Sequence, residues 1–347
     1  GHTMLAALAT GLILAGSGFY GGLLGHINQM NGAAWLPWLV LVIESVARPD
    51  ETAPKSGYPW HAVLRGAVLF GAITALTLLA GHTQTAYINL FGVGLWIVWP
   101  LVSTKLFSEP RQLIAQVLPA LGLYFGGLLL ALLLAAIQLV PTLELSELGL
   151  RSGGLEYGEV SSFSLKPLHL HWTLLPSYGL TDLSVRFSTL GYTEFVAYVG
   201  LIGLVLAIYG LWQGRTTRDR TWTFGLLFVA LGLFLAMGRW NPVYYLLYQF
   251  VPGFDLFRVP ARWLMLYAFG AAILTGIGAE RLPRSRPWLA GISLLLVLEL
   301  FVAGSRLAYS NPTAPAASDS LRTAPAHLLA DSDSGPFRFL SMSDIQY

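Results

Sequence analysis

The segment Gln138-Leu-Val-Pro-Thr-Leu-Glu-Leu-Ser-Glu-Leu-Gly-Leu-Arg151 marks the change in composition that decides the fold. It closes a long apolar run and opens a polar, acid-rich connection over residues 141–193. On both sides of that connection the chain is a series of apolar runs joined by shorter segments. We therefore expect binding or chemistry to be concentrated in and around residues 141–193.

The apolar runs indicate a membrane protein. Of 347 residues, 55% are hydrophobic and 11% are charged, whereas soluble domains average about 25% charged residues. A membrane-spanning helix needs roughly 20 mostly apolar residues. Nine runs approach or reach that length: 5–24, 33–47, 62–80, 84–102, 114–140, 195–211, 223–237, 263–278 and 288–303. We predict an all-α polytopic membrane protein with about nine transmembrane helices.

Basic residues alternate between successive connections, which predicts the orientation. They follow the second, fourth, sixth and eighth runs, whereas the short connections 25–31 and 81–83 have none. The basic residues are Arg48, Lys55, Arg65, Lys105, Arg111, Arg215, Arg218, Arg220, Arg281, Arg284 and Arg286. Because Lys and Arg accumulate in cytoplasmic loops, we predict that the long loop and the C-terminus lie on the extracytoplasmic side.

The sequence divides into a transmembrane helical domain over residues 1–305 and a Pro-, Ala-, Ser- and Asp-rich segment over 306–347. The second part contains Pro336-Phe-Arg-Phe-Leu-Ser341, which is typical of a first strand. We expect a linker into a truncated extracytoplasmic domain, so that the chain is a fragment of a longer protein. It has no cysteine for a disulfide or thiolate site, and no basic stripe for nucleic acid.

An acidic stripe follows the fifth run. Glu144, Glu147 and Arg151 are spaced to share one helix face if the helix continues past Pro141, where a proline commonly causes a kink. Such a kink would tilt the charged turn over the mouth of the bundle. The alternative is a solvated helix end whose charges contribute little.

Four histidines fall in outer segments in this topology: His26, His82, His169 and His171. With Glu144, Glu147 and Glu194 they could hold a divalent cation, because imidazole and carboxylate groups suit such ions. His169 and His171 would point the same way in a strand. No compact ligand motif is present, and histidines of this kind more often form hydrogen bonds at a polar interface.

An arginine pair opens the eighth run in Phe257-Arg-Val-Pro-Ala-Arg262. Arg258 and Arg262 suit a phosphate or carboxylate through bidentate hydrogen bonds. The alternatives are snorkelling to the interface or a structural pair with Asp255 or the acidic loop. In the ninth run, Glu299 could pair with an arginine such as Arg258. We interpret Glu44, beside Arg48, as interfacial.

Several segments, in this order, make the chain resemble the YfhO-like bacterial membrane proteins, a family grouped with GT-C-type glycosyltransferases. They are His26 ahead of Trp35-Leu-Pro-Trp38, Gly81-His-Thr-Gln84, Gln138-Leu-Val-Pro-Thr-Leu-Glu144 followed by Arg151, Gly191-Tyr-Thr-Glu-Phe-Val-Ala-Tyr198-Val-Gly200, and Phe257-Arg-Val-Pro-Ala-Arg262. The similarity extends over nearly the whole chain. It implies an enzyme of the bacterial cytoplasmic membrane that transfers a sugar from a polyprenyl-phosphate donor to a cell-envelope glycan or lipid at the outer face.

The resemblance also implies roles for individual residues. Arg258 and Arg262, then Arg151, would bind the leaving phosphate, and Tyr198 belongs to one of the shared segments. The sugar hydroxyls would contact His26, His82, Gln84, Gln138, Glu144 and Glu194. In such enzymes an acid in the first outer loop acts as base. Connection 25–31 has no acid, so the base is expected upstream of residue 1, or is Glu144 if it lies within this chain.

Two other functions fit the same pattern. A transporter or flippase for lipid-linked sugars would bind the same phosphate without chemistry, but it would need ionisable groups and broken helices deep in the membrane. A non-catalytic membrane protein of envelope assembly would use the outer loop and tail to hold partners. It predicts no cavity that unites the Gly-His turns with Arg258.

Overall fold

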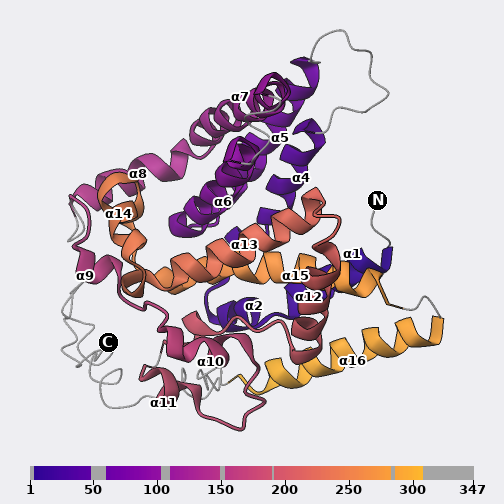
Figure 1. The fold of residues 1–347 in the computed structure, drawn as a ribbon. Helices are drawn as coiled ribbons and strands as arrows, with labels where there is room; N and C mark the ends of the chain where they lie inside the picture. The colour runs from indigo at the N-terminus through magenta and orange to yellow at the C-terminus, as the bar shows by residue number, and fades with distance from the viewer. Residues whose placement is uncertain are drawn as a thin grey trace, which may run out of the picture.

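The structure is a computed structural model that describes residues 4–47, 60–102, 110–148, 153–189, 191–282 and 286–307. Every regular element within those ranges is helical (Figure 1), in agreement with the predicted all-α class. The longer helices are α1 (Met4–Gly16), α4 (Leu36–Ala47), α5 (Trp60–Leu79), α6 (Thr83–Val102), α7 (Pro110–Leu134), α8 (Ala136–Glu147), α12 (Leu201–Gly214), α13 (Arg220–Ala236), α14 (Pro242–Phe250), α15 (Leu264–Glu280) and α16 (Arg286–Ser305). The shorter ones are α2 (Gly18–Gly22), η1 (Leu23–Gly25), α3 (Ile27–Ala33), α9 (Tyr157–Val160), η3 (Pro167–His169), α10 (Leu170–Leu174), α11 (Leu183–Phe187), η4 (Tyr192–Phe195), η5 (Gly238–Trp240), η6 (Phe254–Leu256) and η7 (Pro260–Trp263).

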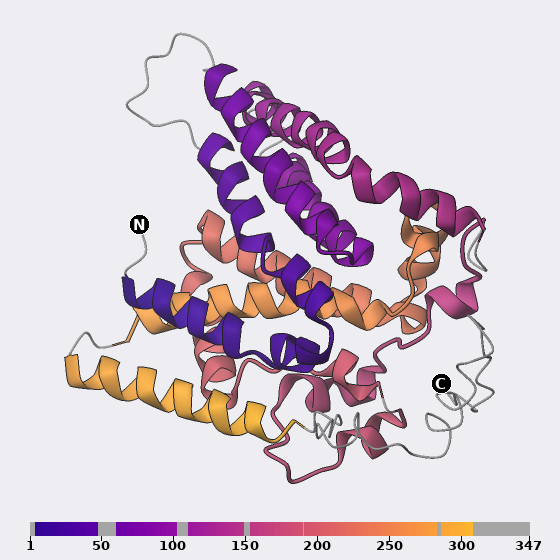
Figure 2. The same ribbon diagram turned by 180° about the vertical axis from the view of Figure 1, so that it is seen from behind.

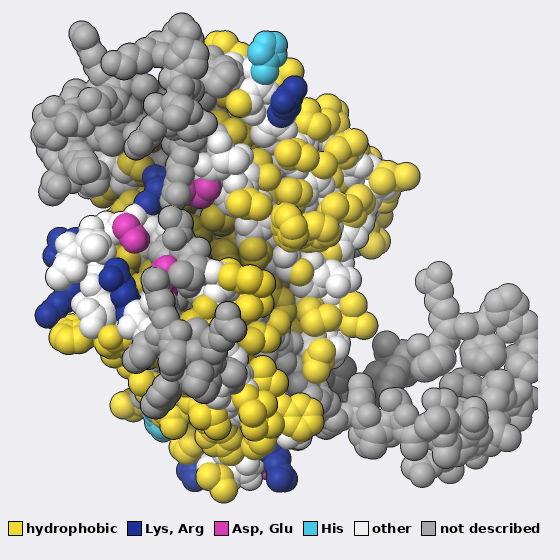
Figure 3. Space-filling model, turned by 90° about the vertical axis from the view of Figure 1, so that its right-hand side faces the viewer, with side chains coloured by type: hydrophobic (Ala, Val, Ile, Leu, Met, Phe, Trp, Pro, Cys, Tyr) yellow, Lys and Arg dark blue, Asp and Glu magenta, His cyan; other side chains and the backbone are white. Residues whose placement is uncertain are grey.

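Five segments of the described chain are long and apolar enough to cross a membrane: Met4–Gly25, Trp60–Leu79, Thr83–Val102, Val117–Leu134 and Pro260–Glu280. Shorter apolar helices cover Leu201–Gly214, Arg220–Ala236 and Gly291–Ser305. Hydrophobic side chains cover much of the described surface in Figure 3, with charged groups confined to a few clusters. The chain is therefore a multi-pass helical membrane protein by length and composition, while the count of nine spans and the sidedness stay predictions.

Two of the apolar runs are interrupted rather than continuous. The first breaks at Ser17, whose hydroxyl donates to the Leu14 carbonyl at 2.8 Å. The fifth breaks at Ala135, where α7 ends and α8 begins, and not at Pro141 as predicted. Proline crowds the carbonyl four residues before it, and the break lies on that N-terminal side. Pro141 itself is inside α8.

The helices form two groups that meet along α13 and α15 (Figures 1 and 2). In one group α5 packs on α7 with α4 and α6 beside them, and in the other α15 packs on α1, α12 and α13. Nearly every side chain of α15 is buried. The α12–α15 contact depends on Gly210, because a Cβ there would overlap the Leu274 carbonyl oxygen. Small residues allow this close backbone approach in membrane bundles.

The long connection is mostly short helical turns. Its first residues continue α8 to Glu147, and the described remainder forms α9, η3, α10, α11 and η4. Hydrogen bonds tie it to the second helix group: Leu155 N donates to Asp255 O at 2.9 Å, and Leu165 N donates to Ala236 O at 2.9 Å. The connection is thus a folded layer over one end of the bundle. The predicted linker and domain start at 308–347 lie outside the described residues.

Candidate functional site

Arg262 is the centre of a polar network at the end of the bundle covered by the long connection. Its Nη2 donates to Glu194 Oε1 at 2.7 Å and its Nε to Oε2 at 3.1 Å. Its Nη1 donates to Gln84 Oε1 at 2.7 Å and lies 3.3 Å from His82 Nε2. The Arg262 and Glu194 side chains are 17% and 10% exposed. The network joins the start of α6, η4 and η7, which are far apart in sequence.

Gln84 extends this network to a strained loop. Its Nε2 donates to the Arg258 carbonyl at 2.6 Å and lies 3.4 Å from the Val259 carbonyl. Val259 is buried and has a φ of 67° and a ψ of 71°. A β-branched residue in this left-handed region is a genuine outlier, and such strain costs on the order of 1–3 kcal/mol. Gln84 therefore helps hold the backbone that carries Arg258 in an unfavourable conformation.

His82 is neutral in this arrangement. Its Nδ1 lies 2.8 Å from Thr85 Oγ1 and 3.2 Å from Thr85 N, while Nε2 faces Arg262. Burial, followed by the positive charges of Arg262 and His26, lowers the pKa of His82 to about 4. A protonated ring would turn an N–H toward a guanidinium, which can only donate. His82 is thus suited to accept a hydrogen bond, and it is a weak base.

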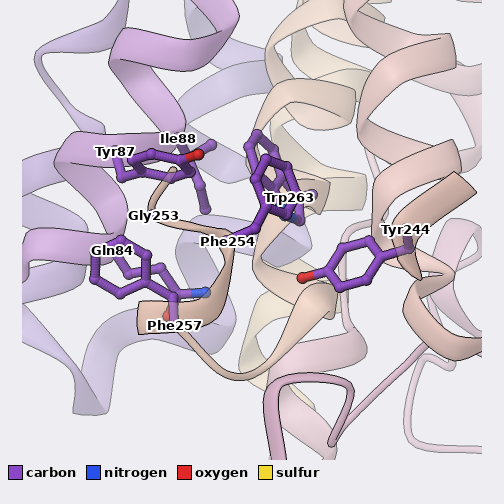
Figure 4. Close-up of a pocket in the computed structure, with 8 residues that line it drawn as sticks. All are labelled: Gln84, Tyr87, Ile88, Tyr244, Gly253, Phe254, Phe257 and Trp263. Atoms are coloured by element: carbon purple, nitrogen blue, oxygen red, sulfur yellow. The ribbon is translucent and has the colours of Figure 1, made fainter. Parts of the chain in front are cut away.

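Beside Gln84 lies a small hollow with a mostly aromatic wall (Figure 4). Figure 4 shows the Gln84 amide and the Tyr244 hydroxyl directed toward it. The lining residues are Gln84, Tyr87, Ile88, Tyr244, Gly253, Phe254, Phe257 and Trp263. Its volume is about 10 Å³, which is room for about one water molecule. A sugar ring does not fit inside the hollow, so a sugar would have to lie over its rim.

Two other predicted residues lie near this centre. The Gln138 amide reaches the Gly81 turn, because a Cβ at Gly81 would lie 3.7 Å from Gln138 Nε2. His26 is exposed and close enough to His82 to affect its pKa. Together with Arg262, these contacts bring both Gly-His turns, Gln138 and Glu194 to one end of the bundle.

The two arginines predicted to act together have different environments. The Arg262 guanidinium contacts Glu194, Gln84 and His82. Of the alternatives given above, a structural pair with the acidic loop therefore applies to Arg262. Arg258 is exposed, and no hydrogen bond joins its guanidinium to any residue in the described ranges. Only Arg258 presents a guanidinium that an anion could reach without breaking the network. The prediction of a two-arginine clamp is corrected accordingly.

The remaining candidates are not in the network. Tyr198 is buried at 2% exposure, with its ring against Gly18 and its carbonyl accepting from Gly18 N at 2.7 Å. Glu144 is exposed on α8, a helix without buried residues. Glu144 and Glu147 both lie in α8, which ends at Glu147, whereas Arg151 lies outside the described residues, so the stripe is described only as far as Glu147.

The other histidines do not assemble a metal site. No group of three or more His, Cys, Asp or Glu side chains that could hold a metal ion occurs in the part of the chain that the structure describes. His169 and His171 are not in a strand, so the strand geometry does not apply to them: His169 ends η3 and His171 is in α10. His169 packs on Phe187 and His171 on Trp172, with ring centroids 5.4 and 4.6 Å apart.

Two glutamates in the apolar runs have partners other than those predicted. Glu299 accepts from the Tyr178 hydroxyl at 2.6 Å, from Leu201 N, and from Ile202 N at 3.0 Å, so it caps the start of α12 instead of pairing with Arg258. Glu44 pairs with Arg220 at 2.7 Å and accepts from Trp96 Nε1 at 2.7 Å. Glu44 therefore joins helices rather than only facing the interface.

Thr85 and Val259 were not among the residues predicted from the sequence. Thr85 is the third residue of α6, and its backbone N and its hydroxyl both lie near Nδ1 of His82, the residue directly before the helix. A polar residue just before a helix of this kind is a general start signal. Val259 precedes a proline, which restricts its backbone, but that rule predicts extended geometry. The left-handed conformation depends on tertiary contacts. No protein-family profile, curated protein or solved structure matches this chain.

Proposed function

We propose that this chain is the membrane part of a glycosyltransferase. It would move a sugar from a polyprenyl-phosphate donor to a cell-envelope glycan or lipid at the outer face of the bacterial cytoplasmic membrane. The observation that carries the proposal is the network of His82, Gln84, Glu194 and Arg262 beneath an exposed Arg258. Such a network is costly to place in an apolar bundle, which favours a functional reason for it.

In this proposal Arg258 binds the phosphate of the donor. Charge-assisted hydrogen bonds from arginine suit phosphate oxygens, and this charge grows as the bond between the sugar C1 and the phosphate oxygen breaks. Arg262 acts as a positioning residue, because it holds Gln84, and Gln84 holds the Arg258–Val259 backbone. His82, His26 and Gln138 border the same end and offer hydrogen-bonding groups for sugar hydroxyls.

The base that takes the proton of the acceptor hydroxyl is not in the Arg262 network. Both oxygens of Glu194 accept from Arg262, and His82 is a weak base. Glu144 is the remaining candidate of this chain. It follows Gln138 by six residues in α8, or about 9 Å along the helix axis, which is within the span of a two-ring ligand. An acid outside residues 1–347 is the alternative.

The transfer assay tests this proposal in the full-length protein in vesicles, with a polyprenyl-phosphate sugar as donor. Arg258→Ala should reduce the transfer rate by about 10²-fold, as the loss of a charge-stabilising donor does in other sites. The matched control is Arg281→Ala, an exposed arginine directly after α15, whose first residues follow the Arg262 turn. Equal rates in Arg258→Ala and Arg281→Ala, with equal membrane insertion, would contradict the proposal.

A transporter of lipid-linked sugars is the second candidate, because two of the apolar runs are broken, at Ser17 and Ala135. Discontinuous helices often surround transport sites. The same vesicles separate the two functions when the labelled headgroup is followed. Transport moves the intact donor between leaflets without an acceptor, whereas transfer releases polyprenyl phosphate only when the acceptor is present.

A further inference from the structure

The outer layer carries a group of aliphatic side chains that face away from the protein. Leu168 in η3, Leu180, and Val185 in α11 are 85%, 87% and 68% exposed. Leu168 and Val185 lie in one region, because His169 packs on Phe187 and the Arg186 guanidinium lies 5.4 Å from the centroid of the Trp172 ring. Leu180 precedes Val185 by five residues in the same connection. On α11 the neighbouring Leu183 and Phe187 are buried. We call Leu168, Leu180 and Val185 the aliphatic patch.

The turn that presents Leu180 is fixed to the end of α16. Tyr178 donates its hydroxyl to Glu299 at 2.6 Å. A Cβ at Gly179 would lie 3.3 Å from Arg306 Cδ, so the turn also touches the residue that follows α16. In Figure 1, α16 and α11, the helix that follows this turn, both lie along the lower side of the molecule. Leu180 is therefore at the level where α16 ends.

The exposed side chains near the end of α16 indicate whether lipid or water surrounds this part of the molecule. Phe301 and Val302 are 72% and 45% exposed, and they lie within one and a half turns of the end of an apolar helix. Such side chains face lipid in a membrane protein. Leu180 lies at the level where α16 ends, so it is at the boundary between the hydrocarbon and the headgroups.

Cations and an aromatic residue lie near the members of the patch, as at a membrane interface. Lys166 precedes η3, Arg186 follows Val185, and Arg306 adjoins Gly179. Trp172 lies under Arg186. Interfacial segments combine Lys and Arg at the headgroups with Leu and Trp in the upper hydrocarbon.

We propose that the aliphatic patch inserts into the outer leaflet of the membrane next to α16, with Lys166, Arg186 and Arg306 at the lipid phosphates. The long connection would thereby be attached to the bilayer on the side of α16. The inference does not depend on the proposed enzyme activity.

Site-directed spin labelling tests the insertion directly, because the chain has no cysteine of its own. Leu168→Cys, Leu180→Cys and Val185→Cys would each carry a nitroxide in the full-length protein in nanodiscs of phosphatidylcholine and phosphatidylglycerol. Collision with oxygen, which concentrates in lipid, is compared with collision with a water-soluble nickel complex. Phe301→Cys is the lipid benchmark, and Glu159→Cys, an exposed charged position of the same connection, is the water benchmark.

The expected ratio of oxygen to nickel collision at Leu180 and Val185 is close to that at Phe301 and at least about tenfold above that at Glu159, because the polar nickel complex is excluded from hydrocarbon. Ratios equal to that at Glu159 would place the patch in water and overturn the proposal. Low collision with both reagents would also overturn it, because it would show that protein covers the patch, either the residues after 307 or another chain.

Discussion

Two arginine–glutamate pairs join distant segments at opposite ends of the bundle, and their surroundings differ. Arg262–Glu194 and Arg220–Glu44 have the same 2.7 Å contact. Around Arg262 the neighbours are polar, namely Gln84 and His82. Around Arg220 they are aromatic and apolar: its guanidinium lies 4.5 Å from the centroid of the Trp96 ring, beside a cavity of about 120 Å³.

The difference separates a structural ion pair from a candidate site. Arg220–Glu44 fastens α13 to α4 and α6, and the cation stacked on Trp96 gains packing as well as charge. Arg262–Glu194 is connected through Gln84 to a strained loop and an exposed cation. An ion pair in a helical membrane protein is thus weak support for a function, whereas strain and an accessible charge next to it are stronger support.

The largest effect is expected where the pair is most buried. Arg262→Ala would leave Glu194 as an uncompensated charge that is 10% exposed, which should lower the free energy of unfolding by about 3–5 kcal/mol. The measurement is equilibrium unfolding in mixed micelles. In the double variant Arg262→Ala/Glu194→Ala much of this loss should be recovered, and a double variant no more stable than Arg262→Ala would contradict the pairing.

The second effect is a dependence of stability on pH, which we expect at the end with Arg262 and not at the end with Arg220. The pKa of His82 is lowered from 6.5 to about 4, so the unfolded chain binds a proton more readily than the folded one. The contribution of neutral His82 to the free energy of unfolding is complete above pH 6.5 and is lost as the pH falls toward 4. We expect about 2 kcal/mol after allowance for solvent screening. The difference in stability between the wild type and His82→Gln should shrink over that pH range, and a constant difference would refute the assignment.

The third effect concerns the opposite end. Arg220→Ala should cost about 1–2 kcal/mol, which is less than Arg262→Ala, because its guanidinium is 29% exposed and water screens the charge. Transfer and phosphate binding should not change. A loss of activity without a loss of stability would mean that the two ends are coupled, and the distinction drawn between them would fail.

The smallest effect tests the strain at Val259. Replacing a buried valine by alanine or glycine removes packing in both cases, but only glycine adopts a positive φ without penalty. Val259→Gly should therefore be more stable than Val259→Ala by about 1 kcal/mol, within the cost of a left-handed residue. The usual order, with alanine more stable than glycine, would show that the loop is not strained there.

The helical class and the positions of the apolar segments were predictable from the sequence, because run length and composition decide them. The convergence of His82, Gln84, Gln138 and Glu194 at one end followed from the order of the connections. The sequence did not indicate which of the two arginines, Arg258 or Arg262, is paired with a glutamate. Arg258 and Arg262 have similar sequence contexts, and only the fold places Glu194 within reach of one of them.

The remaining errors have the same origin in tertiary contacts. Glu299 was assigned an arginine partner by charge, but the free backbone N–H groups of α12 lie next to it and also satisfy a carboxylate. The break at Ala135 lies six residues from the proline that suggested it. For Glu44 the sequence predicted an interfacial position and no partner, and its described partner Arg220 is on a helix far along the chain.

The central claim is that the end with Arg262 binds an anionic, lipid-borne headgroup through Arg258, and the most direct measurement is equilibrium binding of a short-chain polyprenyl phosphate to purified wild-type, Arg258→Ala and Arg220→Ala proteins. We expect Arg258→Ala to bind about ten- to a hundredfold more weakly, because it loses a charge-assisted hydrogen bond, and Arg220→Ala to bind like the wild type. Equal affinities for all three proteins, or a loss in Arg220→Ala alone, would contradict it.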